Sequence, residues 1–386
     1  MNPVTNTGAL AGIRVIDLSR ILGGPYCGQI LGDHGADVLK IEPPQGDDTR
    51  AWGPPFVEQD GVRVASYYLG LNRNKRGTQL DLASESGRAL LLQLLEGADV
   101  LIENFKTGTM EKWVLGYDAL SQRFPRLIHC RVSGFGADGP LGGLAGYDAA
   151  VQAMSGIMSV NGEVGGEPLR VGLPVIDKVT GLNAALGVML ALHERARSGR
   201  GQFVEASLYD SGLSLLHPHA ANWFASGQEP RLTGNAHPNI YPYDAFPTGT
   251  APIFLAVGND RQFGLFCAHL GQPDLAQHPD YATAGARSSN RAALRQRLVA
   301  MLTDQDGPAL AQVLMDIGVP CAPVLSVSAA LQHPHTAHSQ MMVRIGQHYT
   351  GVGAPIKLSR TPATYRLAPP VKPEPLSPPV ASDGDS

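Results

Sequence analysis

The chain has 386 residues, of which 43% are hydrophobic and 17% charged, and its formal net charge is −4. A chain of this length can form two or three domains, and the composition is that of a folded globular protein, not of a disordered or fibrous one. The small negative charge excludes a global electrostatic footprint for nucleic acid or an anionic membrane, so an anionic ligand must meet local basic clusters.

Strand and helix patterns alternate along the first third of the chain. The predicted strands are residues 13–19, 36–42, about 100–104 and about 127–132. The predicted helices follow the first strand, with Pro25 in the first turn, and span about residues 86–96. This alternation predicts a Rossmann-like α/β domain with a parallel sheet, whose ligands bind at the carboxyl ends of the strands.

The glycines after the first predicted strand, in RILGGPYCG, do not follow the G-x-G-x-x-G spacing, and the expected acidic residue after the second strand is absent. This pattern disfavours a nicotinamide-dependent dehydrogenase. The fold class alone does not identify a function.

Residues 171–210 are the most informative stretch. Val179, Leu182, Leu186 and Met189 recur at three- and four-residue spacing, which predicts a helix that ends at Gly199. Its other faces are also apolar or small, so we expect the helix to be buried nearly all round.

Asp177 stands at the head of this helix. One interpretation is that Asp177 caps the helix, a common arrangement that contributes roughly 1 kcal/mol. The other interpretation is that its carboxylate is a nucleophile. We expect the side chain to be ionised in either case, because free N–H groups and the helix dipole favour an anion there.

A further helix is predicted from residue 208 to about 226, followed by a passage rich in Pro and Asn. We predict a large Rossmann-like domain formed by residues 1–226 and 331–367, and a smaller α+β domain formed by residues 227–330. Residues 368–386 are rich in proline and acidic at their end, and we expect this tail to be disordered or extended.

The cysteines indicate neither a disulfide framework nor a zinc site, because Cys27, Cys130, Cys267 and Cys321 are scattered without C-x-x-C spacing. The first residues lack the basic start and apolar run of a signal peptide, and no uninterrupted apolar run reaches transmembrane length. We therefore expect a cytoplasmic protein with neither a membrane nor a nucleic acid as partner.

Six stretches stand in a fixed order between about residues 8 and 367. They are GIRVIDLSRILGGPYCGQILGDHGADVLKIEPP, NRNKRGTQLDL, ADVLIENFKTGTM, GYDAAVQAMSGIMSVNG, VGLPVIDKVTGLNAALGVMLALHERARSGRGQ and GVPCAPVLSV. Together they resemble the CaiB/BaiF family, the class III CoA-transferases. The resemblance implies an interlocked homodimer. In each subunit the N-terminal half and the C-terminal part form a large Rossmann-like domain, and the segment between them forms a smaller domain.

The resemblance also implies a reaction. Asp177, in VIDKVTG, matches the family's catalytic aspartate. It would attack the thioester of an acyl-CoA donor to give an acyl–aspartyl anhydride and then an aspartyl-CoA thioester. A carboxylic acid acceptor would then carry out the same steps in reverse order. Coenzyme A thioesters are then substrates, and neither a permanently bound cofactor nor a metal is expected.

Residues that would contact the CoA and acyl groups follow from the resemblance and from the need for basic groups around phosphates and N–H donors around oxyanions. The candidates are Arg20, Ile21, Leu22, Lys40, Arg73, Arg76, Asn104, Lys106, Lys112, Ser133, Gly134, Phe135 and Tyr147. The alternative for each basic residue is a solvated surface charge, and for Tyr147 it is a buried, hydrogen-bonded tyrosine.

Two other functions stay open. Related 2-methylacyl-CoA racemases carry a histidine before the aspartate of GYDAAVQA, where this chain has Tyr147, a poor base with an ordinary pKa of about 10. A racemase or epimerase is therefore less favoured than a transferase, and the third alternative is a non-catalytic CoA-binding protein. The tail also lacks the GEHT-like segment and final helix of many relatives.

Overall fold

The computed structural model describes residues 7–59 and 61–373, which form two compact units. The large unit consists of the described residues up to Ser155, of Val171–Leu215, and of the described residues from Pro334 onward. The small unit consists of Gly156–Arg170 and Leu216–His333.

The boundaries of the small unit differ from the predicted range 227–330. Its longer segment is Leu216–His333, and a second segment, Gly156–Arg170, belongs to a range that the sequence assigned to the large domain. The physical reason is a contact between distant segments: the backbone oxygen of Gly162 accepts a hydrogen bond from the N–H of Gly234 at 3.0 Å. Sequence periodicity carries no information on such a contact.

A six-stranded parallel sheet organises the large unit, as predicted, with the strand order β5-β2-β1-β6-β7-β8. The strands are β1 (Arg14–Asp17), β2 (Asp37–Glu42), β5 (Lys75–Gln79), β6 (Val100–Glu103), β7 (Ile128–Ser133) and β8 (Phe203–Ser207). The four predicted strands are confirmed. The edge strands β5 and β8 were not predicted, because their sequences, KRGTQ and FVEAS, lack a clear apolar run.

Helices surround this sheet in the large unit. They are α1 (Gly23–Asp33), α2 (Ser66–Leu69), α3 (Glu85–Leu95), α4 (Thr109–Lys112), α5 (Tyr117–Arg123), α6 (Asp148–Met154), α8 (Val175–Ser198), α9 (Leu208–Ser214), α16 (Pro334–His338) and the 3₁₀ helix η1 (Asp48–Ala51). Two hairpins complete the unit, β3 (Phe56–Gln59) with β4 (Val62–Ala65) and β12 (Met342–Ile345) with β13 (Tyr349–Val352).

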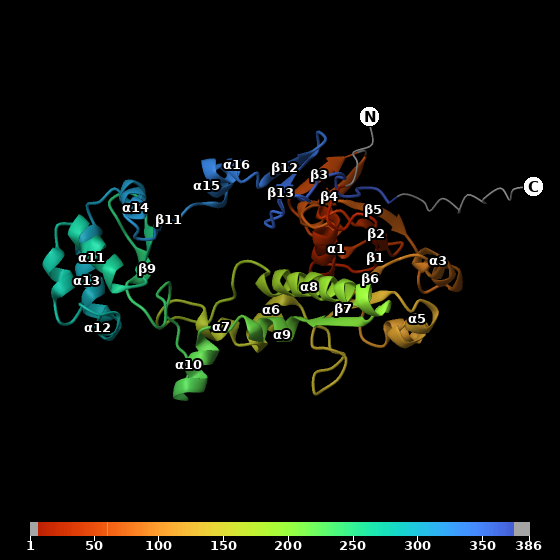
Figure 1. The fold of residues 1–386 in the computed structure, drawn as a ribbon, viewed down its shortest axis with the longest axis horizontal. Coiled ribbons are helices and arrows are strands. Elements are labelled where there is room, and N and C mark those ends of the chain that lie inside the picture. Colours follow the sequence, from red (N-terminus) through yellow and green to blue (C-terminus); the bar gives the residue numbers. More distant parts are fainter. Residues whose placement is uncertain (1–6, 60, 374–386) are drawn as a thin grey trace, which may run out of the picture. The chain divides into compact units, whose positions relative to one another are not determined.

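Helix α8 is the long helix that the sequence predicted, and it ends as expected at Gly199, which adopts a left-handed φ of +77°. It packs against α1 and against strands β7 and β8 (Figure 1). The packing with α1 is close, because a Cβ atom on Gly181 would lie 2.6 Å from the backbone oxygen of Gly23. A glycine is therefore required where the two helices cross.

The sequence predicted that α8 is buried nearly all round, but one of its faces is exposed in the single chain. Its buried face carries mainly small residues, including Thr180, Gly181, Ala184 and Ala185. The larger residues Leu182, Leu186, Met189 and Leu190 are 41–62% exposed in the single chain. By length and composition alone α8 could also cross a membrane, but its packing on the sheet is that of a core helix in a globular unit.

The small unit is built on a three-stranded antiparallel sheet, β11-β10-β9. Its strands are β9 (Tyr243–Phe246), β10 (Ile253–Ala256) and β11 (Cys321–Pro323), and its helices are α7 (Ile157–Val160), α10 (His219–Ser226), α11 (Asp260–His269), η2 (Pro273–Gln277), α12 (Ala284–Ser289), α13 (Arg291–Leu302), α14 (Gly307–Asp316) and α15 (Val327–Gln332). The single helix predicted over residues 208–226 is two helices, α9 and α10, because Pro218 between them has no N–H to donate.

The proline-rich tail was expected to be disordered or extended from residue 368, and residues 368–373 form no helix or strand but are held in place. Arg50 donates hydrogen bonds to the backbone oxygens of Pro370, at 2.9 Å, and Val371, at 2.8 Å, and Pro369 is buried. Residues 374–386 of that prediction lie outside the described residues.

Candidate functional site

A cavity of about 230 Å³ lies at the carboxyl end of the parallel sheet. It is bordered by the turn after β1, the turn after β6, the end of β7 and the head of α8. The predicted site residues that line it are Arg20, Ile21, Leu22, Asn104, Lys106, Ser133, Gly134, Tyr147 and Asp177. This is the edge at which a parallel sheet is expected to bind ligands.

Asp148 caps helix α8. Its Oδ2 accepts hydrogen bonds from the backbone N–H groups of Ile176, at 2.9 Å, and Asp177, at 3.1 Å, and its Oδ1 accepts one from Gln152 at 2.6 Å. The alternative that Asp177 caps its own helix is therefore wrong. Among the described residues the Asp177 carboxylate has no hydrogen-bond partner, and it faces the cavity instead.

The pKa of Asp177 is raised to about 7, first by burial and second by the nearby charge of Asp148. The expectation that Asp177 stays ionised because the helix terminus favours an anion needs correction. The N–H groups that would stabilise its charge already donate to Asp148. Near neutral pH the carboxyl group of Asp177 is a mixture of the protonated and ionised forms.

The first turn of α1 lies against Asp177. A Cβ atom on Gly23 would be 3.6 Å from Oδ1 of Asp177, an ordinary contact distance, so the backbone of the first turn of α1 lies next to the carboxylate. Helix α1 has no side-chain cap. Among the described residues, the N–H groups of Leu22, Gly23 and Gly24 have no hydrogen-bond acceptor. Free N–H donors at a helix N-terminus favour a negative charge beside them.

Tyr67, on α2, is a neighbour of this carboxylate that the sequence did not reveal. The pKa of its phenol is raised to about 12, first by burial and then by the charges of Asp177, Asp148 and Asp47. Its ring contacts Trp52 edge-on, with 5.3 Å between ring centroids. No motif in the sequence distinguished Tyr67 from the adjacent Tyr68.

Lys40 was predicted to contact CoA, and its position contradicts this. The side chain is completely buried, forms an ion pair with Asp47 at 3.0 Å and donates to the backbone oxygen of Ser19 at 2.8 Å. Although burial lowers its pKa, the surrounding carboxylates, Asp47 foremost, outweigh burial and raise it. Lys40 is therefore a permanently charged structural group and not a phosphate ligand.

Arg73 and Arg76 are also paired with carboxylates away from the cavity. Arg73 is buried and forms an ion pair with Asp33 at 2.6 Å, and Arg76, on edge strand β5, pairs with Asp37 at 2.8 Å. The prediction that they contact the same ligand as Asp177 is wrong for this cavity. A basic side chain in the sequence does not show whether its charge is already balanced.

Two further predicted residues do not line the cavity. Lys112 is exposed at the end of α4. Phe135 packs against Tyr209, with ring centroids 5.9 Å apart. Tyr147, in contrast, is 61% exposed and lines the cavity, so it is not the buried, hydrogen-bonded tyrosine of the alternative interpretation.

A groove of about 360 Å³ adjoins the cavity, because Arg20, Phe105 and Lys106 line both. Its other lining residues are mostly apolar and include Ile41, Pro43, Leu80, Leu82 and Trp113. The two hollows together can accept an elongated ligand with its reactive end beside Asp177.

All four cysteines are buried and free, and the described residues contain no group of three or more metal-ligating side chains.

Comparisons with known proteins find similarity over nearly the whole chain. The family model described as CoA-transferase family III matches residues 10–372. The succinate–glutarate CoA-transferase of Agrobacterium fabrum is 42% identical, and the succinyl-CoA:mesaconate CoA-transferase of Haloarcula hispanica is 38% identical; each alignment covers 92% of this chain and 91% of the relative. A crystal structure of a CaiB/BaiF family protein from Brucella suis is 40% identical, with a TM-score of 0.85 and coverage of 94% of this chain and 96% of that one.

The raised pKa of Asp177 predicts a pH-dependent effect on stability. Its pKa rises from 3.8 to about 7 on folding, so the protein loses stability as the pH increases from about 4 to 7. Asp177→Asn removes this loss, and the variant should gain stability relative to the wild type over the same range, by on the order of 2–4 kcal/mol above pH 7.

Thermal unfolding at pH 4, 5, 6, 7 and 8 checks this prediction. Asp177→Glu keeps an ionisable carboxyl group at the same place and should retain the wild-type pH dependence. A difference between Asp177→Asn and the wild type that does not change with pH would show that the carboxyl group is not desolvated in the folded protein.

Proposed function

Because the chain belongs to CoA-transferase family III, we propose that it moves CoA from an acyl-CoA donor to a free carboxylic acid through covalent intermediates on Asp177. The observation that carries this proposal is the position of the Asp177 carboxylate. It faces the cavity without a hydrogen-bond partner among the described residues, because Asp148 takes over the capping of α8.

The reaction consists of four acyl transfers. An oxygen of ionised Asp177 attacks the thioester carbonyl of the donor, and the carbon–sulfur bond breaks to give an anhydride and CoA thiolate. The thiolate attacks the aspartyl carbonyl, which releases the donor carboxylate and leaves an aspartyl-CoA thioester. The acceptor carboxylate attacks that thioester, which releases CoA thiolate and forms a second anhydride. The thiolate then attacks the acceptor's carbonyl carbon, which gives the new acyl-CoA and releases the Asp177 carboxylate. The thioester bond energy is conserved throughout.

The raised pKa of Asp177 suits this chemistry. At a pKa of about 7 a large fraction of the carboxyl group is ionised at neutral pH, and its low solvation makes the ionised form a stronger base than an exposed aspartate. Burial also limits the access of water, which would hydrolyse the anhydride.

Backbone N–H groups at the cavity can stabilise the oxyanions that form in each transfer. Gly23, at the start of α1, lies beside Asp177, and its N–H group is a free donor. Gly134, from the predicted turn after Ser133, also lines the cavity, where a Cβ atom on it would lie 2.6 Å from the backbone nitrogen of Gly146. Donors that are fixed before the reaction act where charge develops.

The rest of the CoA molecule would bind in the adjoining groove. Arg20 and Lys106 stand where the cavity and the groove meet, so both can face the phosphates of a CoA molecule whose thioester lies at Asp177. The apolar side chains of the groove, Trp113 among them, suit the adenine ring.

The proposed role of Asp177 predicts a specific chemical label. Borohydride added together with an acyl-CoA should reduce the aspartyl-CoA thioester and mark one peptide, the one that contains Asp177. Mass spectrometry of the digested protein locates the label. Asp177→Asn should give no label and no CoA exchange between acids, whereas Asp48→Asn, in the same cavity, should still be labelled. A label on another residue, or turnover without any label, would rule out Asp177 as the nucleophile.

We also propose that the acids exchanged are dicarboxylates, since the two curated relatives described above are named for succinate, glutarate and mesaconate. With succinyl-CoA as donor, glutarate or mesaconate should accept CoA at least about 10-fold faster than butyrate, which has one carboxylate. Chromatographic detection of the new thioester measures the rates. Equal rates with monocarboxylates would contradict the proposed substrate class without affecting the role of Asp177.

We also propose that the chain forms an interlocked homodimer. The exposed apolar face of α8, formed by Leu182, Leu186, Met189 and Leu190, supports it, because a contiguous apolar face of this kind is unusual on a monomer. The covering partner would be a second copy of the chain, in keeping with the family resemblance.

Sedimentation at micromolar concentration checks the dimer. The wild type should have twice the mass of the 40.8 kDa chain. Leu186→Glu, which places a charge in the apolar face, should lower the dimer fraction or the yield of folded protein. Leu90→Glu, on α3 and similarly exposed, is the matched control and should stay dimeric. A monomeric wild type, or equal behaviour of the two variants, would contradict the proposal.

A further inference from the structure

The turn between β1 and α1 contains a strained residue at the edge of the reaction cavity. Ile21 has a φ of +71°, in the left-handed region. A β-branched residue is strongly disfavoured there, because its side chain crowds its own backbone. Such a conformation persists only where the surroundings hold it. Ile21 and the next two residues, Leu22 and Gly23, all line the cavity with Asp177.

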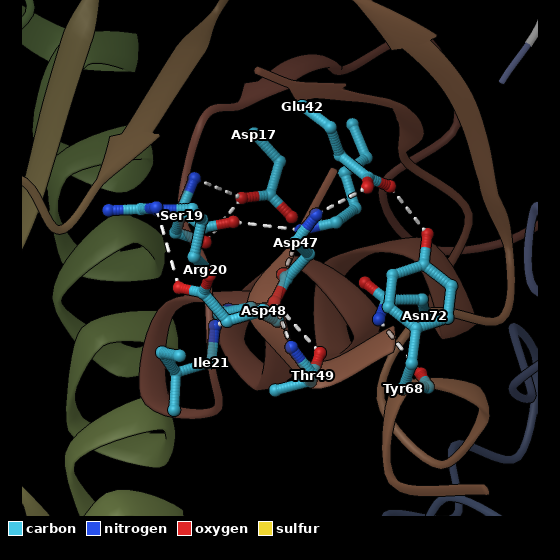
Figure 2. Close-up of polar contacts among 12 residues, drawn as sticks. Asp17, Ser19, Arg20, Ile21, Glu42, Asp47, Asp48, Thr49, Tyr68 and Asn72 are labelled. Atoms are coloured by element: carbon cyan, nitrogen blue, oxygen red, sulfur yellow. Dashed lines mark hydrogen bonds and ion pairs between the residues drawn. The ribbon is translucent and has the colours of Figure 1, made fainter. Parts of the chain in front are cut away.

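The buried Lys40–Asp47 pair holds this turn in place, and Figure 2 shows Asp47 next to Thr49 and the turn residues Ser19, Arg20 and Ile21. Lys40 donates to the backbone oxygen of Ser19 at 2.8 Å, on one side of Ile21. Asp47 accepts from the N–H of Ile21 itself at 3.4 Å, and also from the N–H and the hydroxyl of Thr49. The pair therefore binds the turn at two points of its backbone.

Two other side chains fix the rest of the turn. Asn104, directly after β6, accepts from the N–H of Arg20 at 2.9 Å and donates to its backbone oxygen at 2.7 Å. Asp17, the last residue of β1, accepts from both the N–H and the hydroxyl of Ser19. These tethers come from three neighbouring strands and one loop, so they tie the turn to the edge of the sheet.

Lys40 and Asp47 themselves do not reach the cavity. Both side chains are 0% exposed, and neither lines the cavity or the adjoining groove. Their charges balance each other in a region where an unpaired charge is costly. Any effect of the pair on the reaction must therefore act through the turn that it binds.

We propose that the buried Lys40–Asp47 pair is a positioning device for the transfer reaction, which holds Ile21 in the left-handed conformation so that the first turn of α1 lies against Asp177. The inference rests on the proposed role of Asp177. Without the pair, Ile21 relaxes to a negative φ, and the peptide groups that follow it change direction. The free N–H group of Gly23 then moves away from the reacting carbonyl, and a displacement of about 1 Å at such a donor can lower a rate by about 100-fold.

The first test is the double variant Lys40→Met/Asp47→Asn. It removes both charges together, so no unpaired charge remains in the core, and the asparagine oxygen can still accept from Thr49. We expect kcat to fall at least about 10-fold, with the KM for acyl-CoA changed less than about threefold, because the phosphate contacts are untouched. A crystal structure of the variant should show a negative φ at residue 21. A wild-type kcat, or a left-handed Ile21 together with a lowered kcat, would overturn the inference.

The second test removes the strain. Glycine adopts a positive φ without penalty, so Ile21→Gly lets the turn keep its shape without the pair. The Lys40→Met/Asp47→Asn change should lower kcat by less than about threefold when made in the Ile21→Gly protein. An equal loss of kcat in the wild-type and Ile21→Gly backgrounds would mean that the pair acts on folding and not on the turn, and would overturn the inference.

Asp33→Asn is the matched control. Asp33 forms a buried ion pair with Arg73 at the far end of α1, and neither residue lines the reaction cavity. This variant should lower the melting temperature and leave kcat unchanged, whereas a comparable loss of kcat would overturn the inference. The borohydride label separates the two proposals. If the wild type is labelled at Asp177 but the double variant keeps its kcat, only the positioning role fails; if the wild-type label lies elsewhere, the proposed function fails.

Discussion

The site depends on the capping of helix α8 by a side chain that lies outside this helix. Asp148, at the start of α6, accepts the N–H groups of Ile176 and Asp177 and so satisfies the head of α8. This leaves the Asp177 side chain free to face the cavity, and the charge of Asp148 helps to raise the pKa of Asp177. An aspartate that capped its own helix would be turned toward the backbone and its charge stabilised, so it would be less available as a nucleophile.

The second constraint is the close approach of α1 to α8. Gly181 permits the crossing, and the uncapped first turn of α1 then lies beside Asp177. Helix dipole and free N–H groups then favour negative charge at the point where the proposed intermediates develop it. The large unit thus supplies both the proposed nucleophile and donors for its oxyanions from two helices that only small residues can bring together.

Charged residues of this fold serve two different purposes. Lys40, Arg73 and Arg76 are all held in ion pairs within the large unit, and the first two are buried. Arg20 and Lys106 line the cavity and the groove, and the ion pair of Arg20 with Asp48, at 3.5 Å, is partly exposed. In a protein with a net charge of −4, the local placement of a few cations, not the overall charge, decides where an anionic substrate binds.

The sequence by itself determined the parallel α/β unit, the long helix from Val175 to Ser198 and the family, because apolar periodicity and ordered motifs are local properties of the chain. It also identified Asp177 and the turns that follow β1, β6 and β7, since parallel strands bring their carboxyl ends to one edge. Only the tertiary structure decided that Asp148 is the cap, that Lys40 is buried against Asp47, and that the leucines of α8 are exposed. Each of these depends on contacts between residues far apart in the chain or on which helix face the sheet covers, and neither is encoded in local spacing.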